Sequence, residues 1–81
     1  MIYGYDSRTI NEYGLRQMRE ISVAASPVAL RELAQFFGEC ADELESGGSS
    51  HWHRHASTSL QRQLGCDVIV LNSNGTIQIQ P

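Results

Sequence analysis

One stretch decides the fold: residues 26–45, which read SPVALRELAQFFGECADELE. Apolar side chains recur in it at every third or fourth position, which is the period of one face of an α-helix. Ser26 can accept a hydrogen bond from a free backbone N–H at the start of such a helix, and Pro27 has no N–H to lose at its first position. We therefore predict a helix from about Pro27 to Glu45, ended by Gly47-Gly48. The predicted buried stripe consists of Leu30, Leu33, Ala34, Phe37, Cys40, Ala41 and Leu44.

Short strands are predicted on both sides of this helix. Residues 2–6 and 15–25 precede it, and the β-branched run 67–71 follows it. This run is typical of an interior strand that is covered on both sides, or on one side with a partner on the other. Asn74-Gly75 favours a tight hairpin turn into a last strand at 76–80. Alternation along 15–25 places two sets of side chains on opposite faces, Arg19, Ile21, Val23 and Ala25 against Met18, Glu20, Ser22 and Ala24.

These elements predict a single α+β domain over residues 1–81. Ser57 or Ser59 can cap a short helical turn from Leu60 to Leu64, which Gly65 closes. The expected architecture is a two-layer sandwich, in which one long amphipathic helix covers one face of a mostly antiparallel sheet of four to five strands.

Composition limits the class of protein. The chain of 81 residues has a net charge of −3, which argues against general nucleic-acid binding. No apolar run approaches the ~18 residues of a membrane span, and no basic region followed by an apolar one opens the chain, so a cytoplasmic location is expected. Cys40 and Cys66 fit neither a metal knuckle nor a disulfide scaffold, and both are predicted to be buried, reduced thiols.

The segment from Ser50 to His55 has the most unusual composition, because it holds all three histidines and the only tryptophan. If it is extended, His51, His53 and His55 project from one face, and Trp52 and Arg54 from the other. Alternate strand positions lie roughly 6.5–7 Å apart, so two such imidazoles could converge on one zinc ion. Asp67, Cys66 or Glu20 could supply a further ligand if the strands adjoin.

Three roles are open for these histidines. A structural or partner-contacting role is favoured, because His-x-His is short and no second spaced ligand set accompanies it. A metal site on His51, His53 and His55 is the second possibility, and acid–base catalysis is the third. A nucleophile elbow of the Gly-x-Ser-x-Gly type does not occur, and we predict no catalytic residue.

The predicted helix also carries a polar face rich in acids, namely Glu32, Glu39, Asp42, Glu43 and Glu45. Such a face is either simply solvated or a docking face for a basic partner. Trp and Arg are the residue types enriched at binding hot spots. The predicted partner-binding residues are therefore Trp52, Arg54, His53, His55, Glu39, Asp42 and Glu43.

Several segments, taken in order, resemble the immunity protein 32 family of bacterial polymorphic-toxin systems. They are ISVAASP at 21–27, LRELAQFF at 30–37, CADE at 40–43, the His53-x-His55 element, and DVIV at 67–70. The resemblance spans residues 15–72, and His51 falls outside it. It implies a small cytoplasmic protein, encoded beside a toxin gene, that neutralises the toxin by binding it. It carries over no catalytic residue.

The leading hypothesis is therefore a non-enzymatic, cofactor-free binding protein, an immunity-type inhibitor of a cognate bacterial toxin. No nucleic-acid or membrane partner is expected, and the chain should be a monomer or homodimer. The alternative is a metal-binding domain that holds zinc on His51, His53 and His55, as a small metal-dependent enzyme or otherwise. A third hypothesis is a structural homo-oligomer that pairs through an edge strand at 76–80.

Overall fold

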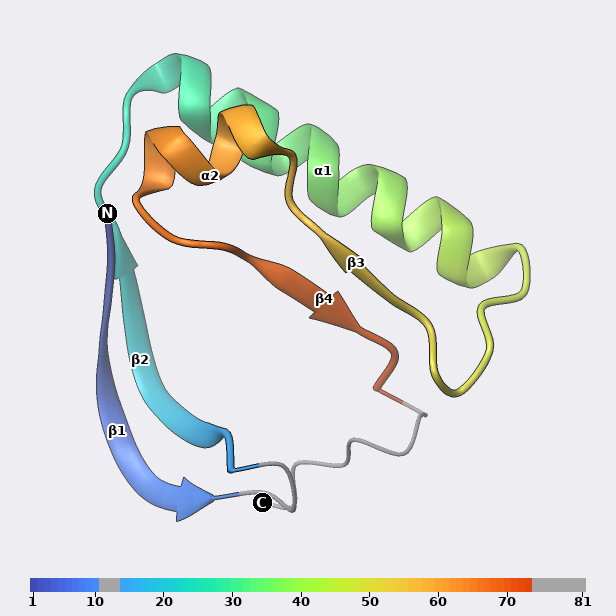
Figure 1. Ribbon diagram of the computed structural model, residues 1–81, viewed down its shortest axis with the longest axis horizontal. Helices are drawn as coiled ribbons and strands as arrows, with labels where there is room; N and C mark the ends of the chain where they lie inside the picture. Colours follow the sequence, from blue (N-terminus) through green and yellow to red (C-terminus); the bar gives the residue numbers. More distant parts are fainter. Residues whose placement is uncertain (11–13, 74–81) are drawn as a thin grey trace.

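The computed structural model describes residues 1–10 and 14–73, which form an α+β arrangement of two helices and four strands (Figure 1). In chain order the elements are β1 (Ile2–Ile10), β2 (Arg16–Val23), α1 (Pro27–Glu45), β3 (His53–His55), α2 (Thr58–Leu64) and β4 (Ile69–Leu71). In these described residues, neither helix combines the length and the hydropathy needed to cross a membrane.

Helix α1 has the predicted bounds and the predicted cap. The Ser26 hydroxyl oxygen accepts a hydrogen bond from the Ala29 N–H at 3.2 Å, and Pro27 occupies the first turn. At the other end, the Ser46 N–H donates to the Asp42 carbonyl at 3.1 Å. Gly47 then turns the chain with φ of 120°, a value that glycine adopts without strain.

The predicted buried stripe of α1 is partly wrong. The buried residues are Ala29, Leu33, Phe36 and Cys40, with Leu44 half-buried, whereas the predicted Leu30 and Phe37 are 44% and 48% exposed. Ala34 and Ala41 are exposed as well. The physical reason is the width of the apolar arc. Nine apolar residues recur between Ala29 and Leu44, and at 100° per residue they form an arc of about 160° around the helix. The described elements pack against only one half of this arc.

The core lies between α1 and α2. Leu60 and Leu64 of α2 are almost completely buried, and they form one cluster with Leu33, Phe36, Cys40 and Ala56. The short helix α2 is capped at both ends as predicted. The Ser57 hydroxyl oxygen accepts from the Leu60 N–H at 3.1 Å, and Gly65 closes the helix in the left-handed region.

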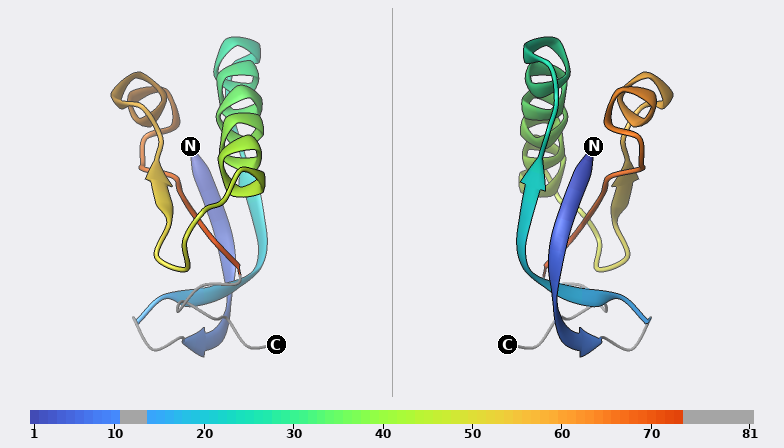
Figure 2. Two further views of the ribbon diagram at one scale, coloured as in Figure 1. Left: turned by 90° about the vertical axis from the view of Figure 1, so that its right-hand side faces the viewer. Right: turned by 90° about the vertical axis from the view of Figure 1, so that its left-hand side faces the viewer.

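The described strands form two separate antiparallel pairs, β1 with β2 and β3 with β4. The predicted single sheet of four to five strands under one helix is therefore not confirmed. In Figure 2 the β1–β2 hairpin bends away from the rest of the molecule, while β3 and β4 lie beside the helices. The expected last strand at 76–80 and its turn at 74–75 lie outside the described residues.

A register shift in the hairpin explains its bend and one wrong face assignment. Glu20 pairs with Tyr5 but Met18 pairs with Asp6, so Arg19 is an extra residue in β2, and such a bulge bends a strand. The bulge brings Met18 onto the face of Ile21 and Val23, although strict alternation predicted the opposite face. A Cβ atom at Gly4 would lie only 2.9 Å from the Met18 sulfur, so glycine permits this close approach.

Strands β1 and β4 also differ from their predicted lengths. Strand β1 extends to Ile10 rather than ending at residue 6, because its pairing with β2 resumes at Ile10 and Arg16. Strand β4 is restricted to three residues by the short β3 beside it, and Ile69 is 48% exposed. Of the two predicted arrangements for 67–71, coverage on both sides is therefore wrong at Ile69.

The core can be tested by paired leucine substitutions. Leu60→Ala should lower the free energy of unfolding by about 2–5 kcal/mol, because it leaves a cavity beside Phe36 and Cys40. Leu15→Ala removes the same atoms from a side chain that is 48% exposed, and it should change stability by less than about 0.5 kcal/mol. Urea unfolding followed by circular dichroism measures both values. Equal losses would contradict the position of the core.

Candidate functional site

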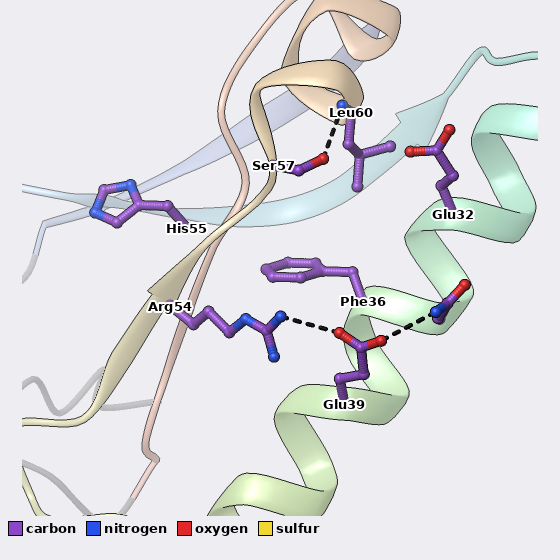
Figure 3. A pocket seen from close by; sticks show the side chains of 8 residues that line it. Glu32, Phe36, Glu39, Arg54, His55, Ser57 and Leu60 are labelled. Atoms are coloured by element: carbon purple, nitrogen blue, oxygen red, sulfur yellow. Dashed lines mark hydrogen bonds and ion pairs between the residues drawn. The ribbon is translucent and has the colours of Figure 1, made fainter.

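An open hollow of about 270 Å³ lies where α1, β3 and α2 meet (Figure 3). The buried side chains of Phe36 and Leu60 line its base, and the half-buried Glu32 and Glu39 lie on the α1 side. The other lining residues are Gln35, Arg54, His55 and Ser57. Apolar contact area and carboxylates therefore meet in one small concave region.

Arg54 connects the histidine strand to α1. Strand alternation turns it toward the helix, where its guanidinium donates to Glu39 Oε1 at 2.9 Å and also pairs with Glu43. The guanidinium carbon lies 5.7 Å from the centre of the Phe36 ring, within the range of a cation–π contact. Because all three charged side chains are more than a third exposed, these ion pairs fix geometry more than they stabilise the fold.

Hydrogen bonds hold Glu39 in its charged form. Gln35 Nε2 donates to Glu39 Oε2 at 3.0 Å, and this bond, followed by the one from Arg54, holds the pKa of Glu39 below its ordinary value. The hydrogen bond to Glu43 raises the pKa of Arg54. On the neighbouring turn, Gln63 of α2 donates to Glu32 Oε1 at 2.8 Å. Hydrogen bonds thus position both Glu32 and Glu39 at the hollow.

The side chains around the hollow carry a net negative charge. Three carboxylates, those of Glu32, Glu39 and Glu43, project from this side of α1, and Arg54 is the one cation that pairs with any of them among residues 1–10 and 14–73. Arg54 can neutralise only one of these charges. We name these three acids with Arg54 the acidic ridge.

The histidines lie on the other side of β3. His53 and His55 are exposed and their ring centres are 5.6 Å apart in an edge-on arrangement, so the predicted alternation with Arg54 is confirmed. His55 Nδ1 lies 2.6 Å from Asp67 Oδ2, and His53 Nδ1 lies 3.2 Å from the His51 carbonyl oxygen. In Figure 3 the His55 ring points away from Phe36 and Glu39.

The described part of the chain contains no group of three or more His, Cys, Asp or Glu side chains placed to hold one metal ion. Of the three proposed additional ligands, Asp67 does contact His55, whereas Cys66 is a free exposed thiol and Glu20 lies in the other sheet. A zinc site on His51, His53 and His55 stays a prediction.

The predicted partner-binding residues have different environments. Trp52 is half-buried and packs against the core, and Arg54, Glu39 and Glu43 bind one another. His53, His55 and Asp42 are exposed. Cys40 is buried as predicted, and burial raises the pKa of its thiol. The predicted burial of Cys66 is wrong, because it follows the turn at Gly65 and points to solvent.

Sequence reasoning missed two members of the site. Glu32 was assigned to the polar helix face but not to binding, although its spacing of seven residues from Glu39 already places both on one side of α1. Asp67 was considered only as a metal ligand, whereas it pairs with His55 of β3 from the segment just before β4. That second contact depends on strand register, which the sequence alone does not define.

The chain matches no family model, no curated protein and no solved structure. The resemblance to the immunity protein 32 family accordingly stays a prediction.

The contact between His55 and Asp67 predicts a measurable shift. The hydrogen bond from His55 is the largest cause that lowers the pKa of Asp67, and the backbone N–H groups of Val68 and Ala56 lower it further. A carboxylate with a lowered native pKa stabilises the fold above its ordinary pKa, and this contribution disappears as the pH falls through the lowered value. Stability from this contact should therefore be lost below about pH 4.

NMR titration of the Asp67 carboxyl carbon provides the measurement. Its pKa should lie below the ordinary value in the wild type and should rise in His55→Asn, with a residual lowering from the two backbone N–H groups. His53→Asn is the matched control, because its ring nitrogen contacts the His51 carbonyl instead of Asp67. An equal effect of the two substitutions would refute the specific contact.

Proposed function

We propose that this chain is a non-enzymatic binding protein of the immunity type, which neutralises a cognate bacterial toxin by occupying it directly. The observation that carries the proposal is the acidic ridge around the open hollow. A basic side chain from a partner could lay its alkyl stem on Phe36 and place its charge beside Glu32 and Glu39.

The internal contacts of the ridge support this role. Gln35 and Arg54 already hold Glu39, and Gln63 already holds Glu32, so the acceptors lose little side-chain entropy when a partner binds. Each carboxylate oxygen can accept more than one hydrogen bond, so capacity for a partner's Lys or Arg remains. The excess of carboxylates would also steer a basic toxin domain toward this surface.

The resemblance to the immunity protein 32 family supports the same conclusion. The segments 30–37 and 40–43 that carry it form most of α1, and His53-x-His55 forms β3, so they are the elements that build the hollow. A toxin inhibitor also needs no catalytic group of its own, and affinity for one basic surface would suffice.

The proposal can be tested by isolating the partner and then changing one charge. The tag-free protein, immobilised through the exposed thiol of Cys66, should retain from the lysate of its native organism one stoichiometric protein that carries a toxin domain. Calorimetric titration of that partner should then show at least about tenfold weaker binding by Glu32→Lys than by the wild type, because the substitution places a like charge beside the incoming cation.

Glu20→Lys is the matched control. It makes the same change of charge at an exposed position of β2, in the other sheet, and should leave the affinity within about twofold. The proposed binding function is refuted if the folded, immobilised protein retains no stoichiometric partner. If a toxin binds but both variants bind it like the wild type, the acidic ridge is not the contact surface.

A further inference from the structure

The uncovered half of the apolar arc on α1 forms a second, separate surface. It consists of Leu30, Ala34, Phe37 and Ala41, which follow one another at intervals of four, three and four residues and therefore share one side of the helix. All four are exposed, and Leu30 and Phe37 are exposed by 44% and 48%. In Figure 2, α1 lies at the edge of the molecule, with an outer side that no drawn element covers. We name these four residues the α1 stripe.

The geometry points to a second copy of this chain as the occupant: we propose that two copies pair through their α1 stripes in an antiparallel orientation. The stripe alternates large and small side chains in a way that is complementary to itself. In the antiparallel register that sets Leu30 opposite Ala41 of the second copy, Phe37 lies opposite Ala34 of the second copy. Each large side chain then meets a small one, as ridges-into-grooves packing requires.

Charges beside the stripe select the same orientation. Arg31 and Asp42 flank it on one side, with Gly38 between them, and neither has a salt bridge within the part of the chain that is described. In the antiparallel register, Arg31 lies about 3 Å along the helix axis from Asp42 of the second copy, and the two-fold axis repeats the pair. A parallel pair would instead set Leu30 against Leu30, and it would place Arg31 and Asp42 of the two copies on opposite flanks of the contact, where they cannot pair.

The inference goes beyond the proposed function and does not depend on it. The α1 stripe and the carboxylates of Glu32, Glu39 and Glu43 lie on opposite sides of α1, because their centres are separated by about 190° around the helix. A second copy on the stripe therefore leaves the hollow accessible. The small Ala34, Gly38 and Ala41 also permit the close axial approach that an apolar helix pair needs.

Sedimentation velocity of the full, tag-free chain is the experiment. The protein should sediment as a mixture of monomer and dimer that shifts toward dimer as its concentration rises from about 10 μM to about 1 mM. Ala34→Glu should raise the dimer dissociation constant at least about tenfold, because it places a charge in the apolar contact. Ala24→Glu makes the same substitution at an exposed position outside α1, and it should leave the constant within about twofold.

A charge exchange tests the orientation. Arg31→Glu and Asp42→Arg should each weaken the dimer, and the double variant should restore it, because an antiparallel pair recovers both ion pairs with their signs reversed. A monomer at every concentration overturns the proposal, as does a dimer that Ala34→Glu leaves intact. A double variant no tighter than the single ones overturns the antiparallel arrangement. Circular dichroism confirms that each variant is folded.

Discussion

The contact between one face of α1 and the short helix α2 is the interaction on which the other elements depend. A helix of seven residues does not form by itself in water, so α2 exists because Leu60 and Leu64 are buried against Leu33 and Phe36. The chain enters α2 from β3 and leaves it toward β4. Fixing α2 on α1 therefore fixes the start of one strand and the approach to the other, and it creates the hollow between them.

Strand alternation then divides β3 into two chemically different sides. Arg54 faces α1 and lies across Phe36 to reach Glu39 and Glu43, so the strand is attached to the helix by a charged and an aromatic contact at once. His53 and His55 necessarily face outward, where Asp67 of the neighbouring segment meets one of them. The three residues of β3 thus supply the cation of the acidic ridge, which is Arg54, and an exposed pair of imidazole rings. Trp52, the previous inward residue, packs on the core and anchors the strand from the other end.

The parts that were predictable from the sequence are those that depend on neighbouring residues. The caps by Ser26 and Ser57 and the ends of α1 follow from local hydrogen bonds, and the structure confirms them. The buried half of α1 could not be chosen, because periodicity identifies an apolar arc but not which part of it another element covers. The bulge at Arg19 and the contact of His55 with Asp67 depend on register between strands, for which no single segment carries a signal. The position of Glu32 and Glu39 on one side of α1, in contrast, could have been predicted from their spacing of seven residues.

The three sides of α1 explain how so small a chain can combine two associations. One side makes the core, one carries the acids of the hollow, and one carries the α1 stripe. An antiparallel pair has its two-fold axis perpendicular to the helices, so the two hollows of a dimer would point away from each other. Two basic partners could then bind without contact, and neither could bridge both hollows unless it wrapped around the dimer. Dimerisation is therefore expected to leave the affinity of each hollow unchanged. Its contribution would instead be to stability, because covering Leu30 and Phe37 adds apolar burial to a domain whose own core is small.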